Sequence, residues 1–274
     1  MRSLAAALTA ALVFAGCAGR PSAVARLGGV LTAPSPAVGA AVDSPTVVIA
    51  TLAAVETSIR DPSTPGADLD RLGRQEQELY RALFAHPDWQ PAAVAGVPSA
   101  VRPAVEANLA AAAELARLSG PKPELPHWRV VTPAPAASLV AYYKRAGAAS
   151  GVAWPYLAAI NLVETRMGRI RGASSAGAQG PMQFLPSTWA IYGAGGDINS
   201  EHDAIAAAAR LLRANGAPKD MARALLAYNN SKHYVNAVTA YAGVIAADER
   251  AYVAYHAWQV YYGDRLLPEG FTNP

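Results

Sequence analysis

The chain has 274 residues, of which 52% are hydrophobic and 16% charged, with a formal charge of +3 and a single cysteine. This length suffices for one large or two small domains, and the composition is typical of a packed globule rather than of a disordered chain. The basic excess is small and unclustered, which does not favour nucleic-acid binding, and one cysteine excludes both an intrachain disulfide and a cysteine-based metal site.

The first sixteen residues have the pattern of an export signal. Arg2 precedes an apolar run over residues 4–15, which is shorter than the roughly 20 residues that span a membrane. The sequence Phe14-Ala15-Gly16-Cys17 resembles the lipobox of bacterial lipoproteins, in which the signal is cut before a cysteine that then carries lipid. We therefore expect a lipoprotein signal peptide over residues 1–16 and lipid attachment at Cys17. The alternative is an ordinary secretory signal that contains a cysteine, and both interpretations place the mature protein outside the cytoplasm.

Two regions without a helical period divide the rest of the chain. Residues 17–43 are rich in Ala, Pro, Gly, Val and Ser, and they predict a flexible tether. Residues 121–136 contain five prolines and predict an extended connector. We therefore expect a helical N-terminal module over residues 44–120 and a second domain over residues 137–274.

The N-terminal module is expected to contain three helices. Val48, Leu52, Val55 and Ile59 recur at helical spacing, until a Pro- and Gly-containing stretch interrupts the pattern. A second helix is predicted from about residue 68 to 85, and an Ala-rich third one lies between residues 102 and 119. None of them carries a reactive constellation, so the module is predicted to support the second domain or to bind a partner.

A helix that begins at Pro155 carries one carboxylate, Glu164, close to its end. Leu157, Ile160 and Glu164 follow one another at helical spacing, so they share a face on which an apolar residue would be expected. Burial disfavours the charged form of a carboxyl group and raises its pKa. A protonated glutamic acid is what general-acid cleavage of a glycosidic bond requires. The alternative is a glutamate at a helix end whose side chain reaches solvent or caps a neighbouring group.

Residues 172–180 form a loop of small side chains after this helix. Glycine allows backbone angles that are closed to other residues and lets the backbone approach a ligand closely. The alternative is a plain flexible linker. The same stretch half-resembles the elbow of serine hydrolases, but a helix precedes it and Ala176 stands where that motif needs glycine, which excludes that interpretation.

Four short motifs in this order resemble the bacterial lytic transglycosylases of goose-lysozyme-like (SLT) fold. They are Val163-Glu164-Thr165 with Gly168-Arg169, the stretch from Ser174, Pro181-Met182-Gln183-Phe184, and Ala227-Tyr228-Asn229. The match is closest to the membrane-bound B type and its actinobacterial relatives, and it covers roughly residues 131–262. The resemblance implies a mainly α protein, with a lysozyme-like helical catalytic domain preceded by the small helical module.

The resemblance also assigns roles to five residues. Glu164 aligns with the single catalytic acid of the family, and Ser174 with a serine that helps to place the sugar or its acetamido group. Gln183 matches a glutamine that lines the cleft, and Tyr228-Asn229 matches a motif whose tyrosine lies near the acid. The chain departs from the family in having Glu-Thr where soluble members have Glu-Ser, a change that keeps the hydroxyl. It also lacks a long insertion after the glutamate, which affects the shape of the cleft wall.

The implied activity is cleavage of the β-1,4 bond between N-acetylmuramic acid and N-acetylglucosamine, with formation of 1,6-anhydromuramyl ends. Glu164 would act first as an acid and then as a base, without a cofactor or metal. The expected partners are peptidoglycan strands, other cell-wall enzymes and a membrane reached through the lipid anchor, with the protein a monomer in the cell envelope. The alternatives are a hydrolytic muramidase on the same fold and a non-catalytic lipoprotein that binds glycan or acts as a scaffold.

The remaining polar and aromatic residues are given structural roles. Ser200 and Asp203 have the spacing of a helix start, so Asp203 is expected to cap a helix rather than to act as a second catalytic carboxylate. A calcium-loop pattern over residues 197–208 lacks the required Gly and Glu, and the five histidines show no paired ligand spacing. C-terminal aromatics are expected to form core, whereas three others were expected to line a groove: Trp189, Tyr234 and Tyr241.

Overall fold

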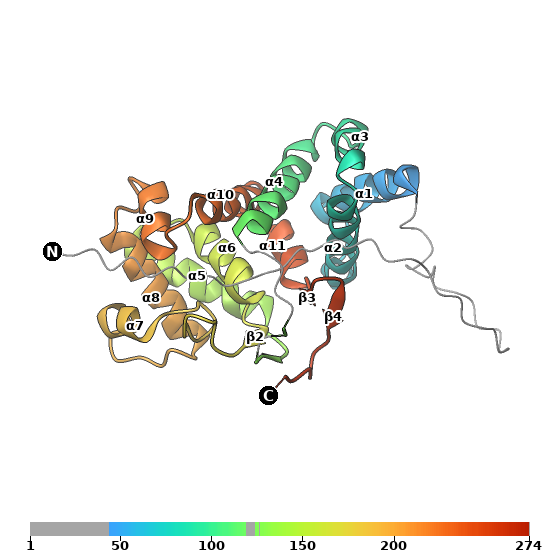
Figure 1. Cartoon of the computed structure of the whole chain (residues 1–274). Coiled ribbons are helices and arrows are strands. Elements are labelled where there is room, and N and C mark those ends of the chain that lie inside the picture. Colours follow the sequence, from blue (N-terminus) through green and yellow to red (C-terminus); the bar gives the residue numbers. More distant parts are fainter. Residues whose placement is uncertain (1–43, 119–123, 126, 274) are drawn as a thin grey trace.

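The structure, a computed structural model, describes residues 44–118, 124–125 and 127–273 (Figure 1). It is 64% helical with little strand, which confirms the mainly α class. The predicted signal peptide (1–16), the tether (17–43) with Cys17, and part of the connector lie outside the described residues. Within those residues, no helix is both long and apolar enough to cross a membrane.

The N-terminal region, described over residues 44–118, contains four helices within that range, three of which were predicted from the sequence. α1 buries the predicted apolar face, and Pro45 stands in its first turn, where a missing backbone N–H costs nothing. The additional helix is short and follows directly after a turn of 3-10 helix. The elements are α1 (Pro45–Arg60), η2 (Gly66–Asp68), α2 (Leu69–Ala85), η3 (Pro87–Trp89), α3 (Gln90–Gly96) and α4 (Arg102–Leu118).

The second region, described over residues 127–273, contains seven helices and two small antiparallel sheets within those residues, in which β1 pairs with β2 and β3 with β4. The helices are α5 (Ala136–Ser150), α6 (Trp154–Thr165), α7 (Pro186–Tyr192), α8 (Glu201–Ala214), α9 (Met221–Tyr228), α10 (Lys232–Ala247) and α11 (Glu249–His256). The strands are β1 (Arg129–Val130), β2 (Ile170–Arg171), β3 (Val260–Tyr262) and β4 (Arg265–Leu267).

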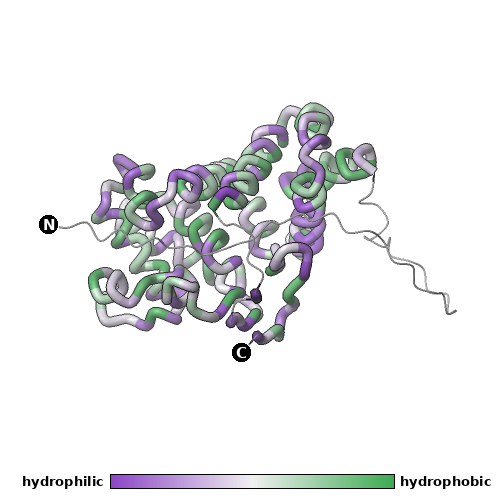
Figure 2. Tube along the Cα trace, viewed as in Figure 1, coloured by the Kyte–Doolittle hydropathy of each residue, from purple (hydrophilic) through white to green (hydrophobic). Residues whose placement is uncertain are grey.

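Helix α6 lies at the centre of the second region. α5, α8, α10 and α11 all pack against it, and every residue from Leu157 to Thr165 is buried (Figure 1). This burial follows from the sequence, because a helix that is apolar on all sides is stable only when it is covered on all sides. The helices at the surface of the molecule differ from α6, because hydrophobic and hydrophilic residues alternate along them, as in amphipathic helices (Figure 2). A carboxylate at the end of α6 is therefore carried into the interior.

One hydrophobic core extends through both regions. α4 packs on α10 and α2 packs on α11. The side chain of Gln77 on α2 makes two hydrogen bonds to the backbone of Gln259: its Nε2 donates to the carbonyl at 2.9 Å, and its Oε1 accepts from the N–H at 2.7 Å. The indole of Trp258 also donates to the buried carboxylate of Glu76 at 2.9 Å. Apolar packing and buried hydrogen bonds thus join the N-terminal helices to the second region.

Candidate active site

The carboxyl group of Glu164 is buried at the end of α6, with the residue 3% exposed. Its Oε1 accepts a hydrogen bond from the hydroxyl of Tyr234 at 2.8 Å, and its Oε2 is buried without a hydrogen-bond partner among the described residues. Burial raises the pKa of Glu164 to about 8, and the hydrogen bond from Tyr234 opposes this only in part. The 3% exposure excludes the alternative of a glutamate that reaches solvent, and the raised pKa favours the protonated form at neutral pH.

Tyr228 and Tyr234 form a stacked pair beside this acid. Their rings are nearly parallel, at 5°, with centroids 6.2 Å apart. The hydroxyl of Tyr228 donates to the carbonyl of Met182 at 2.6 Å, while Phe184 packs against the ring of Tyr228 with centroids 5.8 Å apart. Burial raises the pKa of both tyrosines, so both hydroxyls stay protonated and able to donate. Tyr228 thus fixes the backbone at Met182, after the loop, and Tyr234 fixes the carboxyl group of Glu164, each through one hydrogen bond.

The motifs do not predict the hydrogen bond from Tyr234 to Glu164, since they place Tyr228 near the acid and Tyr234 was expected only to line a groove. The helical spacing around Tyr234 could have predicted its burial. Tyr234, Val238, Tyr241 and Ile245 recur at helical spacing and all lie on the buried face of α10. A buried tyrosine hydroxyl needs a hydrogen-bond partner, so a buried carboxyl group nearby could have been expected.

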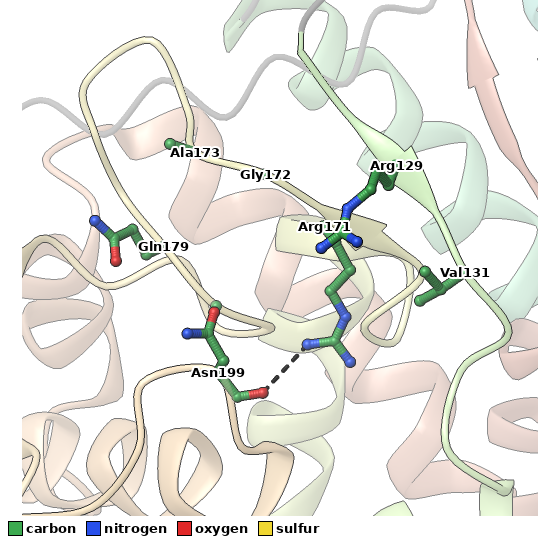
Figure 3. A pocket seen from close by; sticks show the side chains of 8 residues that line it. Arg129, Val131, Arg171, Gly172, Ala173, Gln179 and Asn199 are labelled. Atoms are coloured by element: carbon green, nitrogen blue, oxygen red, sulfur yellow. Dashed lines mark hydrogen bonds between the residues drawn. The ribbon is translucent and has the colours of Figure 1, made fainter. Parts of the chain in front are cut away.

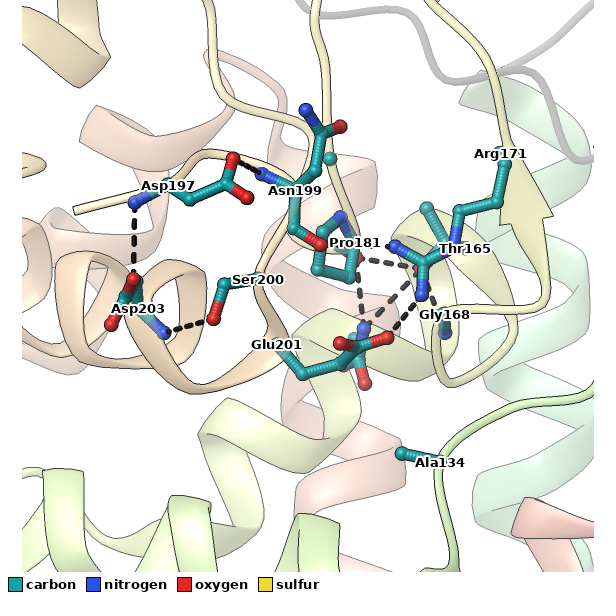
Figure 4. A network of polar contacts seen from close by, with 12 residues as sticks. Ala134, Thr165, Gly168, Arg171, Pro181, Asp197, Asn199, Ser200, Glu201 and Asp203 are labelled. Carbon is teal, nitrogen blue, oxygen red and sulfur yellow. Dashed lines mark hydrogen bonds and ion pairs between the residues drawn. The ribbon is translucent and has the colours of Figure 1, made fainter.

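The end of α6 is tied to the end of the following loop by hydrogen bonds to the carbonyl of Pro181 (Figure 4). The hydroxyl of Thr165 donates to it at 2.6 Å, and the amide of Asn161 donates to it at 2.8 Å. The same hydroxyl accepts from the backbone N–H of Gly168 at 3.0 Å. All three residues after the helix, Arg166 to Gly168, have left-handed backbone angles, which reverses the chain within one turn. The threonine that replaces the expected serine therefore retains a hydroxyl with a structural role.

Ser174 closes the loop after α6 on itself. Its Oγ accepts from the backbone N–H groups of Ala176 at 3.2 Å and Ala178 at 3.0 Å, and its own N–H donates to the carbonyl of Ala178 at 2.9 Å. The side chain is partly exposed, and no hydrogen bond joins it to Glu164 in the described part of the chain. The loop is thus internally hydrogen-bonded rather than a plain linker, and a contact of Ser174 with sugar remains a prediction.

Gln183 holds the two ends of the same loop together. It is buried, has a left-handed backbone with φ of 49°, and donates from Nε2 to the carbonyls of Gly180 at 3.0 Å and Gly172 at 3.4 Å. Its neighbour Met182 accepts the hydroxyl of Tyr228, which places Gln183 one residue from the tyrosine pair. The amide nitrogen of Gln183 therefore bonds the loop backbone. The predicted contact of Gln183 with the glycan would have to use its amide oxygen.

Asn229 lies buried between α9 and α10. Its N–H donates to the carbonyl of Leu225 at 2.9 Å and its carbonyl accepts from Ser231 at 2.7 Å, so it directs the chain from Tyr228 towards Tyr234. The structure thus brings together Glu164, Tyr234, Tyr228 and the segment around Gln183. Asn229 joins the helices that carry the two tyrosines, and Ser174 lies in the loop whose ends Gln183 holds together.

An open cavity of about 550 Å³ is bordered by both ends of the loop over residues 172–180 (Figure 3). Glu164 is not among the residues that line it. Two arginines and two side-chain amides contribute to its walls, together with backbone from the loop. The lining residues are Arg129, Val131, Arg171, Gly172, Ala173, Gln179, Gly180 and Asn199.

Ser200 and Asp203 both contribute hydrogen bonds at the start of α8. The capping side chain at the start of α8 is Ser200, whose hydroxyl accepts from the backbone N–H of Asp203 at 3.3 Å. The carboxylate of Asp203 instead accepts from the backbone N–H of Asp197 at 3.0 Å, in the turn before the helix. No cluster of three metal-ligating side chains occurs among the residues that the structure describes.

The C-terminal aromatics expected as core divide into two groups. Tyr252, Tyr255 and Trp258 are buried, as expected, while Tyr261 and Tyr262 are only partly so. Tyr241 lies in the same core, edge-on to the rings of Tyr255 and Trp258, and is 1% exposed, which corrects its assignment to a groove. Trp189 is partly exposed and packs edge-on against Phe184.

Comparisons of the chain with protein-family models, with curated proteins and with solved structures find no match.

Proposed function

We propose that the protein is a lytic transglycosylase of the cell envelope, which cleaves the β-1,4 bond between N-acetylmuramic acid and N-acetylglucosamine and leaves 1,6-anhydromuramyl ends. The observation that carries this proposal is the state of Glu164. Its carboxyl group is protonated at neutral pH, with one oxygen bonded by Tyr234 and the other without a partner in the described part of the chain. A neutral acid with a free oxygen is a suitable proton donor to a glycosidic oxygen.

A mechanism with one carboxyl group fits this environment. Burial and Tyr234 are the influences on the pKa of Glu164, and no second carboxylate of the described residues contributes to it. Glycosidases with two carboxylates use the second as a base or nucleophile, whereas substrate-assisted enzymes rely on a group of the sugar instead. In the proposed reaction, Glu164 protonates the glycosidic oxygen, and the acetamido group of N-acetylmuramic acid stabilises the cation that develops at the anomeric carbon.

The second half of the reaction reverses the role of Glu164. Its carboxylate takes the proton from the 6-hydroxyl of the muramyl residue, and that oxygen attacks the anomeric carbon to close the anhydro ring. Between the two steps Tyr234 stabilises the carboxylate through its hydrogen bond. Because Oε2 is buried, the substrate must displace side chains that cover this oxygen. Ser174, Gln183, Tyr228 and Asn229 are proposed to orient the sugar and the surrounding backbone.

The test is digestion of purified cell walls by the wild type and by Glu164→Gln. General acid–base catalysis typically contributes about 10² to 10⁴ in rate, so release of soluble fragments should fall at least about a hundredfold. Glu106→Gln, which changes an exposed glutamate on α4, should leave the rate unchanged. Undiminished release by Glu164→Gln would refute the assignment of the acid.

The products separate the competing activities. An anhydro end has the mass of a reducing end less one water, so mass spectrometry distinguishes a transglycosylase from a hydrolytic muramidase. Binding to walls without any release of fragments would favour a non-catalytic lipoprotein. The proposed anchor has its own test: incorporation of labelled fatty acid by the wild type and its loss in Cys17→Ser.

A further inference from the structure

The open cavity beside the loop is lined by two arginines that the small sheet places opposite each other. Arg129 on β1 and Arg171 on β2 are direct partners in the antiparallel register. Side chains of directly opposed residues emerge on the same face of a sheet, within roughly 4.5–5.5 Å at Cβ. Both arginines therefore reach into the same cavity, as Figure 3 shows.

Only one of these two arginines has a carboxylate partner among the described residues. Arg171 forms an ion pair with Glu201 and donates to the backbone carbonyl of Asn199 at 3.3 Å. The guanidinium of Arg129 is exposed and makes no hydrogen bond or ion pair with the part of the chain that the structure describes. The carboxylate of Asp197 is already engaged by the backbone N–H of Asn199 at 2.9 Å. Because opposed like charges destabilise a sheet, an anion between these arginines would be favourable.

The remaining walls offer groups that hydrogen-bond to amides. The exposed side chains of Gln179 and Asn199 each carry one acceptor and two donor hydrogens, which suits the peptide group. Gly172 and Gly180 contribute bare backbone. A Cβ atom at these positions would lie 2.5 Å and 1.9 Å, respectively, from carbonyl oxygens of adjoining segments, so no side chain can narrow the cavity there. The two guanidinium groups suit a carboxylate, and the surrounding amides suit the peptide groups attached to it.

We propose that this cavity binds a carboxylate of an acidic peptide and, resting on the proposed function, that the peptide is the stem peptide of the peptidoglycan strand. Stem peptides begin at the lactyl group of N-acetylmuramic acid, which lies next to the bond that Glu164 would cleave. The loop between Gly172 and Gly180 borders the cavity, and Gln183 holds the same two glycines beside the tyrosine pair. The sugar and its peptide would thus both border the loop over residues 172–180.

The test measures binding of a synthetic stem tetrapeptide to the full chain by calorimetry, for the wild type and three variants. Arg129→Gln should weaken binding about tenfold, as expected for the loss of one charge-assisted contact, and Arg129→Lys should weaken it less. Arg145→Gln removes the same charge from an exposed position on α5 and should change nothing. Equal affinity of Arg129→Gln and the wild type would overturn the site, and inorganic phosphate that binds as tightly as the peptide would overturn its peptide character.

A second measurement separates this proposal from the proposed function. Glycan strands with their stem peptides, and strands stripped of peptides by an amidase, are digested in parallel. The wild type should cleave the peptide-bearing strands faster, and Arg129→Gln should reduce the ratio of the two rates. If neither substrate is cleaved, the proposed function fails, while calorimetry with the tetrapeptide still decides whether the cavity binds an acidic peptide.

Discussion

Replacing Glu164 by Gln should make the folded protein more resistant to alkaline pH. The carboxyl group has a pKa of about 8 in the folded protein, against a usual value of 4.5 in an unfolded chain. A group whose folded pKa is raised contributes stability that is complete below the unfolded pKa and is lost as the pH rises through the folded one. Each pH unit between the two values is worth about 1.4 kcal/mol, so the free energy of unfolding should fall by roughly 5 kcal/mol across this window.

Urea unfolding followed by circular dichroism measures this loss. From about pH 5.5 to about pH 8.5 the wild type should lose about 3 kcal/mol more than Glu164→Gln, because glutamine does not titrate. Comparing the two proteins at each pH removes the contributions of other groups, including buried Glu76, whose pKa is also raised by burial. Glu106→Gln should follow the wild type at both pH values. An equal loss in wild type and Glu164→Gln would show that Glu164 is not a buried neutral acid, and would refute the basis of the mechanism.

Three further substitutions probe the surroundings of this acid. Tyr234→Phe removes the hydrogen bond that favours the carboxylate, so the pKa of Glu164 should rise above about 8, by roughly one to two units, in a ¹³C NMR titration; a lower pKa would contradict the assigned contact. Thr165→Val should cost about 1–3 kcal/mol in urea unfolding, because it removes the acceptor of the buried Gly168 N–H and leaves the carbonyl of Pro181 only the amide of Asn161, whereas Thr165→Ser should retain most of the stability. Gly180→Ala places a Cβ atom 1.9 Å from a backbone carbonyl and should destabilise the protein far more than Gly177→Ala, which has a similar φ but nothing within 4 Å; equal effects would argue against this packing.

The sequence was most informative where periodicity and burial agree. The apolar run after Pro155 predicted a helix, because a helix depends on local spacing. The same spacing placed Glu164 on the apolar face but left both a buried acid and a glutamate that reaches solvent open, and the structure decides for burial. The start of α8 was likewise predicted from the Ser-x-x-Asp spacing, although the capping side chain is Ser200. Helices α1, α2 and α4 followed from the same 3.6-residue pattern, with boundaries close to those expected.

The sequence was least informative where residues far apart in the chain meet. The contact of Tyr234 with Glu164 joins residues 70 positions apart, and the pairing of Arg129 with Arg171 depends on a register that two-residue strands do not encode by themselves. The motif predicts that Ser174 contacts the sugar, which stays a prediction, but it does not reveal that the hydroxyl also accepts hydrogen bonds from the backbone of its own turn.

The shared core limits which N-terminal helices can be combined with which second region. Gln77 bonds both the N–H and the carbonyl of Gln259, and the side chain of Glu76 accepts a hydrogen bond from the indole of Trp258. Buried polar groups of α2 and of the second region are therefore each other's hydrogen-bond partners. A second region transplanted behind a foreign N-terminal module would expose apolar surface and leave these buried polar groups without partners. Homologous recombination within the connector should therefore yield functional chimaeras only when both parents preserve this set of contacts, and the two regions should be inherited together.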